Sequence, residues 1–174
     1  LAESRRWPLA GLSVTIPHKQ AVLERVTVCD DLVQGIGAAN TLRFLPDGGI
    51  EARNTDATAA VESLQAAIAA QASDLGGPRA GTKSALVLGA GGAARAVAFG
   101  LKHAAMEVTV TSRTSERAKE IADDVGCRAV DWDGRYRKPY DCIINATPVG
   151  MHPNVNETPF DKSALRPYMI VFDT

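Results

Sequence analysis

The pattern of hydrophobic and polar residues differs between the two halves of the chain. Up to about residue 56 the apolar runs are short, with GLSVTIP (11–17) predicting a strand and KQAVLERV (19–26) a turn or two of helix. From residue 84 onward, apolar runs alternate with amphipathic segments in a β-α-β-α-β order. Strands that are apolar on both faces are typical of a parallel sheet covered on both sides. We therefore predict an α/β protein.

The first half also contains a predicted hairpin and a long helix. The segments NTLRFL (40–45) and GIEARNT (49–55) surround Pro46-Asp47-Gly48-Gly49, whose proline and glycines favour a tight turn. The alanine-rich run at 57–72 has high helix propensity. The stretch SDLGGPRAGTK (73–83) then predicts a linker because it contains several glycines and a proline.

We accordingly place a domain boundary near residue 80, with one unit at 1–80 and a second at 81–174. The second unit has predicted strands at SALVLGA (84–90), EVTVTS (107–112), CRAV (127–130), DCIINAT (141–147) and YMIVFD (168–173). Its predicted helices are AARAVAFGLKHAA (93–105) and SERAKEIADDV (115–125).

Composition excludes several classes of function. With 45% hydrophobic residues, 22% charged residues and a formal net charge of -1, the chain has no basic excess for nucleic acid. Its three cysteines show neither CxxC nor Cys/His spacing, so we expect no disulfide framework, no metal site and a reducing compartment. No apolar run reaches membrane-spanning length, and the first residues do not form a signal peptide. Because the chain starts at Leu1 and stops just after MIVFD, we expect a fragment of a longer polypeptide.

A glycine-rich motif lies between the first strand and the first helix of the second half. The segment VLGAGGAARA (87–96) contains Gly89-x-Gly91-x-x-Ala94, the dinucleotide fingerprint, in the required strand-to-helix position. The first glycine permits a tight turn, the second lets the backbone approach a pyrophosphate, and the small Ala94 allows close helix packing. Glycine-rich loops also occur without ligands, but this context favours a Rossmann-type dinucleotide-binding domain.

The end of the second predicted strand indicates which dinucleotide binds. An NAD site usually places an acid there, about 20 residues after the glycines, to bind the ribose hydroxyls. Here Ser112-Arg113-Thr114 follows the strand, and Arg117 lies one helical turn further on. Two guanidiniums beside hydroxyls favour a 2′-phosphate, so we predict NADP rather than NAD. For Arg117, a solvated surface position is the alternative.

Other strand ends carry the remaining candidate site residues. NATPVGM (145–151) follows the fourth strand, where a nicotinamide is expected to lie, although its turn is equally compatible with a plain loop. In the first half, Thr15 and Lys19 (TIPHK), Asn40 (GAANT) and Asp56 (RNTDA) end or begin strands and would converge on one cleft. A lysine and an aspartate there would suit proton transfer, because carbonyl reduction creates an alkoxide. Singly, Lys19 is equally a solvated lysine and Asp56 an N-cap.

Six motifs in this order, GLSVTIPHK, GAANT, NTD, GAGGAARA, SRTSERA and NATPVGM, resemble the shikimate dehydrogenase family over nearly the full 174 residues. GLSVTIPHK and the segment 150–173 most resemble the form fused to a 3-dehydroquinate dehydratase domain, as in plants. The resemblance implies an NADP(H)-dependent interconversion of 3-dehydroshikimate and shikimate, in the shikimate pathway of aromatic amino-acid biosynthesis. It implies a small-molecule substrate, no nucleic acid or membrane partner, and a cytoplasmic location, or a plastid one if the source is a plant.

The resemblance also implies residue roles. The first half would be part of a smaller α/β substrate-binding domain, with Lys19 and Asp56 catalytic and with substrate bound by Thr15, Lys19, Asn40 and Asp56. The cofactor-binding residues fall in three groups: Gly89, Ala90, Gly91, Gly92 and Ala93 for the pyrophosphate; Ser112, Arg113, Thr114 and Arg117 for the 2′-phosphate; Thr147, Pro148, Val149 and Met151 beside the nicotinamide.

This chain departs from the family pattern at a few points. The family usually has Asn in place of Ser112, and a glycine shortly after NTD, where this chain reads ATAA. The family's paired serines for the substrate carboxylate would precede Leu1, and a tyrosine and a glutamine near the substrate would follow Thr174. Two alternatives stay open: a quinate/shikimate dehydrogenase, and a catalytically silent NADPH-binding regulator, against which Lys19 and Asp56 argue.

Overall fold

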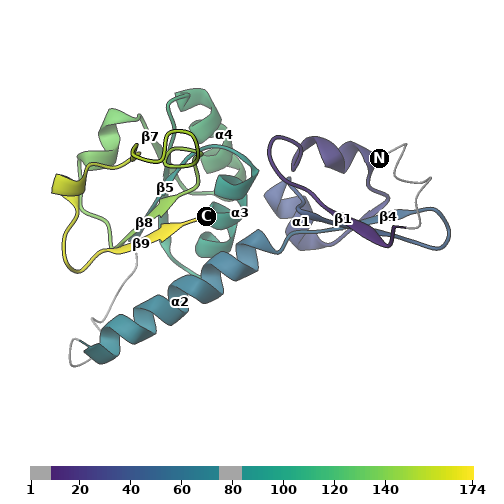
Figure 1. Cartoon of the computed structure of the whole chain (residues 1–174), viewed down its shortest axis with the longest axis horizontal. Helices are drawn as coiled ribbons and strands as arrows, with labels where there is room; N and C mark the ends of the chain where they lie inside the picture. Colours follow the sequence, from purple (N-terminus) through teal and green to yellow (C-terminus); the bar gives the residue numbers. More distant parts are fainter. Residues whose placement is uncertain (1–8, 75–83) are drawn as a thin grey trace.

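Two β-sheets and a long helix organise the chain. A computed structural model describes residues 9–74 and 84–174 (Figure 1). The first sheet has the strand order β1-β3-β4-β2, and the second has the order β7-β6-β5-β8-β9. Helix α2 (Asp56–Asp74) starts beside the first sheet and runs along the second (Figure 1). The boundary predicted near residue 80, with most of the predicted linker, lies outside the described residues.

The predicted hairpin is confirmed as the centre of the first sheet. Strand β3 (Thr41–Phe44) pairs antiparallel with β4 (Ile50–Arg53). In the turn between them, Asp47 Oδ1 accepts from the Gly49 N–H at 2.9 Å, and Gly48 takes a φ of 86°. Glycine adopts this conformation without a Cβ clash, which is why the turn can be this tight. The sheet is completed by β1 (Gly11–Ser13), antiparallel to β3, and by β2 (Val28–Cys29), parallel to β4.

The first strand is shorter than the sequence predicted. The prediction of a strand over 11–17 is wrong beyond Ser13, which pairs with Thr41, the first residue of β3. Past that point β1 has no further partner strand, so the chain leaves the sheet and turns at Ile16 and Pro17. Residues Ala21–Arg25 then form the short 3-10 helix η2, close to the expected helical turn.

One short helix in the first half was not predicted. Helix α1 (Asp31–Ile36) begins after Asp30, whose side chain accepts from the Val33 N–H at 2.8 Å. Val33 and Ile36 are fully buried against the sheet and the neighbouring helices. Six residues are too few to show the periodicity on which sequence prediction of helices relies.

The second sheet confirms the predicted alternation of strands and helices. All its strand pairs are parallel: β5 (Ser84–Leu88), β6 (Glu107–Thr111), β7 (Arg128–Val130), β8 (Cys142–Asn145) and β9 (Ile170–Asp173). The crossover helices are α3 (Gly92–His103) and α4 (Ser115–Val125), and short 3-10 helices are η3 (Asp133–Tyr136) and η4 (Lys162–Ala164). The strand order, with β5 central, is that of the Rossmann-type fold.

Both faces of the second sheet are covered, as expected for strands that are apolar throughout. Successive β5 residues alternate between the two sides, with Val87 in one core cluster and Leu88 in the other. Helices α2, α3 and α4 pack on the Val87 side. The Leu88 side is covered by Tyr140, Phe160 and residues around the 3-10 segments. This arrangement leaves the carboxyl ends of the strands free to form a site.

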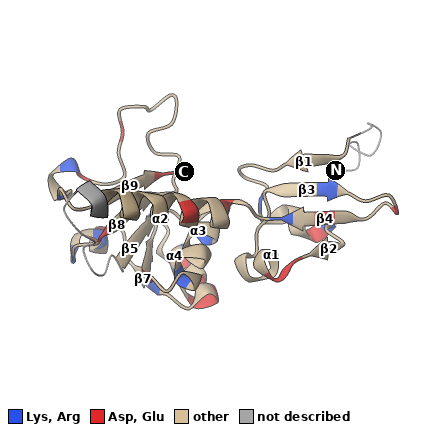
Figure 2. Cartoon of the chain, turned by 90° about the horizontal axis from the view of Figure 1, so that it is seen from below, with Lys and Arg blue, Asp and Glu red and all other residues tan. Residues whose placement is uncertain are grey.

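The two halves are joined by a small apolar cluster. Ile36 and Ala38 of the first half pack with Ala57 of α2 and Ala96 of α3, all of them buried. Acidic and basic residues are interspersed over both halves, in keeping with the small net charge (Figure 2). In the described part of the chain, no helix has the length and apolar character needed to cross a membrane.

Candidate active site

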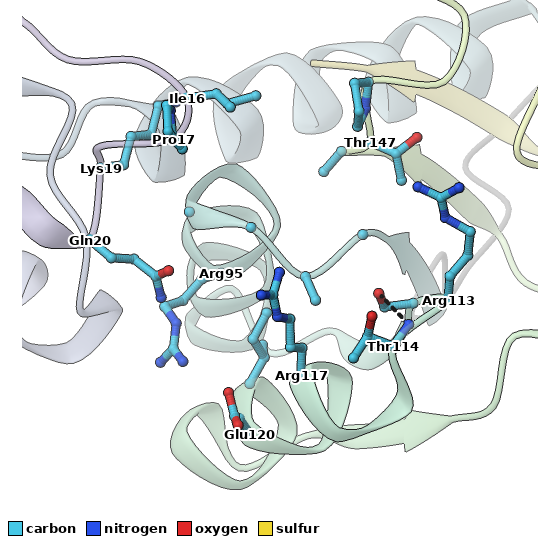
Figure 3. Close-up of a pocket in the computed structure, with 18 of the residues that line it drawn as sticks. Ile16, Pro17, Lys19, Gln20, Arg95, Arg113, Thr114, Arg117, Glu120 and Thr147 are labelled. Atoms are coloured by element: carbon cyan, nitrogen blue, oxygen red, sulfur yellow. Dashed lines mark hydrogen bonds between the residues drawn. The ribbon is translucent and has the colours of Figure 1, made fainter.

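A cavity of about 550 Å³ opens at the carboxyl ends of β5, β6 and β8, where the first half faces the second (Figure 3). This is the edge at which open parallel sheets bind ligands. Its walls come from both halves. The lining residues are Ile16, Pro17, Lys19, Gln20, Gly89, Ala90, Gly91, Gly92, Arg95, Ser112, Arg113, Thr114, Arg117, Glu120, Ile121, Trp132, Ala146, Thr147, Pro148 and Val149.

The first glycine of the motif is required by the protein itself. Gly89 leaves β5 with a φ of 122°, a conformation that L side chains rarely adopt. A Cβ built there would lie 2.5 Å from the carbonyl oxygen of Ala146, in the loop after β8. Glycine at this position therefore lets the two strand ends approach each other.

The second glycine faces only the cavity. Gly91 has extended backbone, with φ -96° and ψ -174°, and a Cβ built on it would meet no atom within 4 Å. Gly91 is also the N-cap of α3, and no side chain caps this helix start. The first N–H groups of α3 are thus available to an anion, and the missing Cβ leaves room for it. These features fit a dinucleotide pyrophosphate, as the sequence predicted.

Two arginines at the end of β6 carry positive charge into the same cavity. Arg113 follows the strand and extends toward the loop that carries Thr147, whereas Arg117 points from α4 toward the glycine loop (Figure 3). Within residues 9–74 and 84–174 neither guanidinium has a hydrogen bond or an ion pair. The intervening turn is held by a 3.3 Å hydrogen bond from the Thr114 N–H to the Ser112 hydroxyl. Two unpaired guanidiniums favour an anionic group such as a phosphate.

The loop after β8 is organised by a buried asparagine. The Asn145 Oδ1 atom accepts from the N–H and hydroxyl of Thr147, at 3.0 and 2.6 Å, and its amide donates to the carbonyl of Val149 at 3.1 Å. Thr147, Pro148 and Val149 consequently form one wall of the cavity. Met151, predicted beside the nicotinamide, is 58% exposed and lies outside the lining.

Lys19, Asp56 and Asn40 form a connected polar group. Lys19 Nζ donates to Asp56 Oδ2 at 2.7 Å, and the Asn40 amide donates to Asp56 Oδ1 at 2.7 Å. The Lys19 and Asp56 side chains are 15% and 27% exposed, so the pair is partly shielded from water. Lys19 lines the cavity, whereas Asp56 and Asn40 are not among the lining residues. A lysine held by a carboxylate can present an oriented ammonium to a bound carbonyl oxygen.

The hydrogen bonds at the start of α2 show whether Asp56 caps this helix or is available to Lys19. Asn54, which is buried, accepts from the N–H groups of Asp56 and Ala57 through Oδ1, at 3.0 and 3.4 Å. Asn54 therefore performs the capping that the sequence had offered as the alternative role of Asp56. The Asp56 carboxylate is left to bind Lys19 and Asn40.

Two further predicted site residues, Thr15 and Ala93, neither bond to the Lys19–Asp56–Asn40 group nor line the cavity. Thr15 is exposed on the turn before Lys19, and its hydroxyl makes no hydrogen bond with a described residue. Ala93 belongs to the first turn of α3 but does not line the cavity.

Eight residues that line the cavity were not among the predicted site residues: Ile16, Pro17, Gln20, Arg95, Glu120, Ile121, Trp132 and Ala146. Arg95 lies on α3 and makes an ion pair with Asp124 at 2.5 Å. Trp132 follows β7, and the Arg135 guanidinium lies 4.1 Å from its ring centroid. Because Trp132 also follows a predicted strand, the same reasoning from strand ends could have identified it. Glu120 is one turn after Arg117, so helical spacing alone was enough to find it.

The largest pKa shift among the described residues lies outside the cavity. Burial raises the pKa of the Cys142 thiol to about 12, and the carboxylate of Asp141 acts in the same direction. Cys29, Cys127 and Cys142 are all free thiols. Among residues 9–74 and 84–174, no three His, Cys, Asp or Glu side chains are grouped so as to hold a metal ion.

Comparison with protein families identifies two matches. Residues 1–42 match the family described as shikimate dehydrogenase substrate binding domain. Residues 69–165, more than half of the chain, match the family described as shikimate / quinate 5-dehydrogenase. The order of these matches agrees with the two halves of the structure.

Individual relatives agree with the family matches. The bifunctional 3-dehydroquinate dehydratase/shikimate dehydrogenase of Arabidopsis thaliana is 38% identical over 172 residues, covering 94% of this chain and 28% of its own length. The shikimate dehydrogenase (NADP(+)) of Ignicoccus hospitalis is 50% identical over 145 residues, covering 81% of this chain and 50% of its own.

A solved structure shows the same arrangement. The shikimate 5-dehydrogenase of Thermus thermophilus, in complex with NADP(H) and shikimate, is 33% identical with a TM-score of 0.79. The match covers 98% of this chain and 60% of that one. The chain spans 28–58% of the length of the curated relatives that it matches.

Proposed function

The chain belongs to the shikimate dehydrogenase family, and on that premise we propose that it carries out the reversible, NADPH-dependent reduction of 3-dehydroshikimate to shikimate. The observation that carries the proposal is the Lys19–Asp56 ion pair, 2.7 Å long, whose lysine lines the same cavity as a dinucleotide-type glycine loop. A dinucleotide-binding protein without redox chemistry has no need of such a pair. The pair therefore favours an enzyme over a silent regulator.

We assign cofactor binding and action on the substrate to residues on two different sides of the cavity. On one side, the free N–H groups at the start of α3 would hold the pyrophosphate, and Arg113 and Arg117 would hold the 2′-phosphate. Thr147, Pro148 and Val149, which line the cavity, would lie beside the nicotinamide ring. The bound dinucleotide supplies the hydride.

On the other side, Lys19 acts on the substrate oxygen. Its ammonium stabilises the negative charge that develops when the carbonyl is reduced, and donates the proton that completes the hydroxyl. Asp56 orients the ammonium through its 2.7 Å contact, and Asn40 orients Asp56. We also assign Thr15 to the substrate side, since it is exposed and lies four residues before Lys19 in the same connection between β1 and η2.

The test is an activity assay on the natural polypeptide that carries this sequence. We expect NADP+ reduction in the presence of shikimate and NADPH oxidation in the presence of 3-dehydroshikimate, both followed by the absorbance of NADPH. Tight NADPH binding without turnover of either substrate would instead support a regulator.

Quinate is a second candidate substrate, because the family that matches residues 69–165 is described as shikimate / quinate 5-dehydrogenase. A parallel assay with quinate decides between the two. A kcat/KM for quinate above that for shikimate would reassign the substrate.

The proposal also includes a fused dehydratase domain and a subcellular location. The Arabidopsis relative supports a 3-dehydroquinate dehydratase domain on the same polypeptide, which sequencing of the reading frame would test. The three free thiols support a reducing compartment, the cytoplasm or a plastid, which localisation of a tagged protein would test.

A further inference from the structure

The third glycine of the loop, Gly92, lies against the side chain of Lys19. Gly92 is the first residue of α3, and its φ is not in the left-handed region that favours glycine. A Cβ built on Gly92 would lie 2.9 Å from Cβ and 3.3 Å from Cδ of Lys19. Contacts under 3.0 Å are essentially never seen for real Cβ atoms, so one of the two residues would have to shift. A side chain at position 92 would therefore clash with Lys19.

Lys19 is poorly placed to move away from such a contact. Its carbonyl oxygen accepts from the N–H of Ala39, a fully buried residue, at 2.8 Å. Its ammonium is held by Asp56 at 2.7 Å. The aliphatic part of the side chain, between these two fixed ends, is the part that lies against Gly92. A methyl group at position 92 would therefore displace the ammonium, the backbone or both.

The neighbouring glycine provides the contrast. A Cβ on Gly91 would meet nothing within 4 Å and would project into space that we assign to the pyrophosphate. Two adjacent glycines in one loop thus face opposite partners, the dinucleotide and the lysine.

We infer that Gly92 is a positioning residue for Lys19, so that the glycine loop both binds the dinucleotide and sets the position of the ammonium that acts on the substrate. The inference rests on the proposed function, because that function assigns the catalytic role to Lys19. It adds a direct contact between the cofactor loop and the catalytic group.

The test compares Gly92→Ala with Gly91→Ala in the natural polypeptide. We expect Gly92→Ala to lower kcat by about 10- to 100-fold while the Kd for NADPH stays nearly unchanged, since a displacement of about 1 Å in a catalytic group costs up to about 100-fold. Gly91→Ala should instead weaken NADPH binding, because its Cβ would occupy space that we assign to the pyrophosphate. A Gly92→Ala variant that weakens NADPH binding and keeps its kcat would overturn the inference.

A double-mutant comparison separates positioning from general damage. In a Lys19→Ala background, Gly92→Ala should cause no further loss of kcat/KM, because no ammonium remains to be displaced. An equal loss in both backgrounds would overturn the inference. If Gly92→Ala is too unstable for kinetics, Lys19→Gly, which removes both contacting carbons, should restore its melting temperature. If Lys19→Gly does not restore the melting temperature of Gly92→Ala, the clash with Lys19 is not the cause of the instability and the inference is overturned.

The same experiments distinguish this inference from the proposed function. If the parent polypeptide turns over neither shikimate nor 3-dehydroshikimate, or if Lys19→Ala leaves turnover intact, the proposed function fails. If Lys19→Ala strongly lowers turnover and Gly92→Ala behaves as the parent does, only the inference fails.

Discussion

Lys19 and Asp56 are 37 residues apart in the chain, yet the lysine ammonium and the aspartate carboxylate are 2.7 Å apart. They come from separate local structures, a turn before η2 and the first residue of α2. Neither residue caps a helix, and the Asp56 carboxylate has only Asn40 and Lys19 as its hydrogen-bond partners among the described residues. This arrangement has a consequence for how the two residues contribute to catalysis.

We expect Lys19 and Asp56 to act as one unit. Lys19→Ala and Asp56→Ala should each lower kcat/KM by about 10²- to 10⁴-fold, because each removes the oriented ammonium or its support. The double variant should lose much less than the product of the two single losses, while NADPH affinity stays nearly unchanged. Steady-state kinetics on the two single variants and the double variant would measure this. Losses that multiply fully would show that the residues work independently.

The unpaired arginines predict cofactor preference. Arg113→Asp should erase or reverse a preference for NADP(H) over NAD(H), because each charge-assisted hydrogen bond to the 2′-phosphate contributes about 1.5–3 kcal/mol, which is about tenfold or more in affinity. Titration of NADPH and NADH by fluorescence would measure the ratio. Lys119→Asp is the matched control, since Lys119 is exposed on α4 outside the cavity lining. Equal affinities for the two dinucleotides in the parent protein would contradict the prediction.

Gly89 and Gly91 should respond differently to alanine. Gly89→Ala should lower the free energy of unfolding by at least about 1–3 kcal/mol, because it forces a side chain into a strained conformation and against the Ala146 carbonyl. Gly91→Ala should leave the melting temperature nearly unchanged, because its Cβ meets nothing in the protein. Thermal unfolding followed by circular dichroism would measure both. A large destabilisation by Gly91→Ala would mean that position 91 serves the fold rather than a ligand.

Cys142 should be unreactive in the folded protein. It is fully buried, and burial raises the pKa of its thiol from 9.0 to about 12. Iodoacetamide at a mildly alkaline pH, below the ordinary thiol pKa, should therefore spare Cys142 until the protein is unfolded, because the thiolate is the reactive form. Mass-spectrometric mapping of the alkylated peptides would show this directly, and rapid labelling of Cys142 in the native state would contradict it.

The same thiol should make stability depend on pH. Above pH 9 the unfolded thiol loses its proton while the folded one keeps it, so the contribution of Cys142 to the free energy of unfolding is lost as pH rises from 9.0 to about 12. Below the unfolded pKa of 9.0 this contribution should be constant. Unfolding by urea across this range would measure the loss, and a Cys142→Ala variant should lack that component.

The elements that the sequence predicted well are those whose signal is local and repeated. The hairpin at 41–53, the helix that begins at Asp56 and the strands and helices from Ser84 onward follow from turn residues, helix propensity and alternating apolar runs. Helix α1 was missed because six residues carry too little periodicity. The end of β1 was misplaced because its length depends on where the partner strand β3 begins.

The candidate site divides in the same way between sequence and structure. Gly89 to Gly92, the two arginines and Thr147 to Val149 were found from sequence alone, because a strand, a tight turn and a helix start are adjacent in the chain and define a phosphate-binding position locally. The sequence also predicted that Lys19 and Asp56 converge on one cleft, whereas their 2.7 Å contact, the capping of α2 by Asn54 and the contact of Gly92 with Lys19 required the tertiary structure. The Lys19 contacts depend on distances between segments that are remote in sequence. The capping of α2 depends on which of two nearby side chains, Asn54 or Asp56, accepts from the first N–H groups of the helix. Such distances are set by the packing of the two halves around Ile36, Ala38, Ala57 and Ala96, which no local pattern encodes.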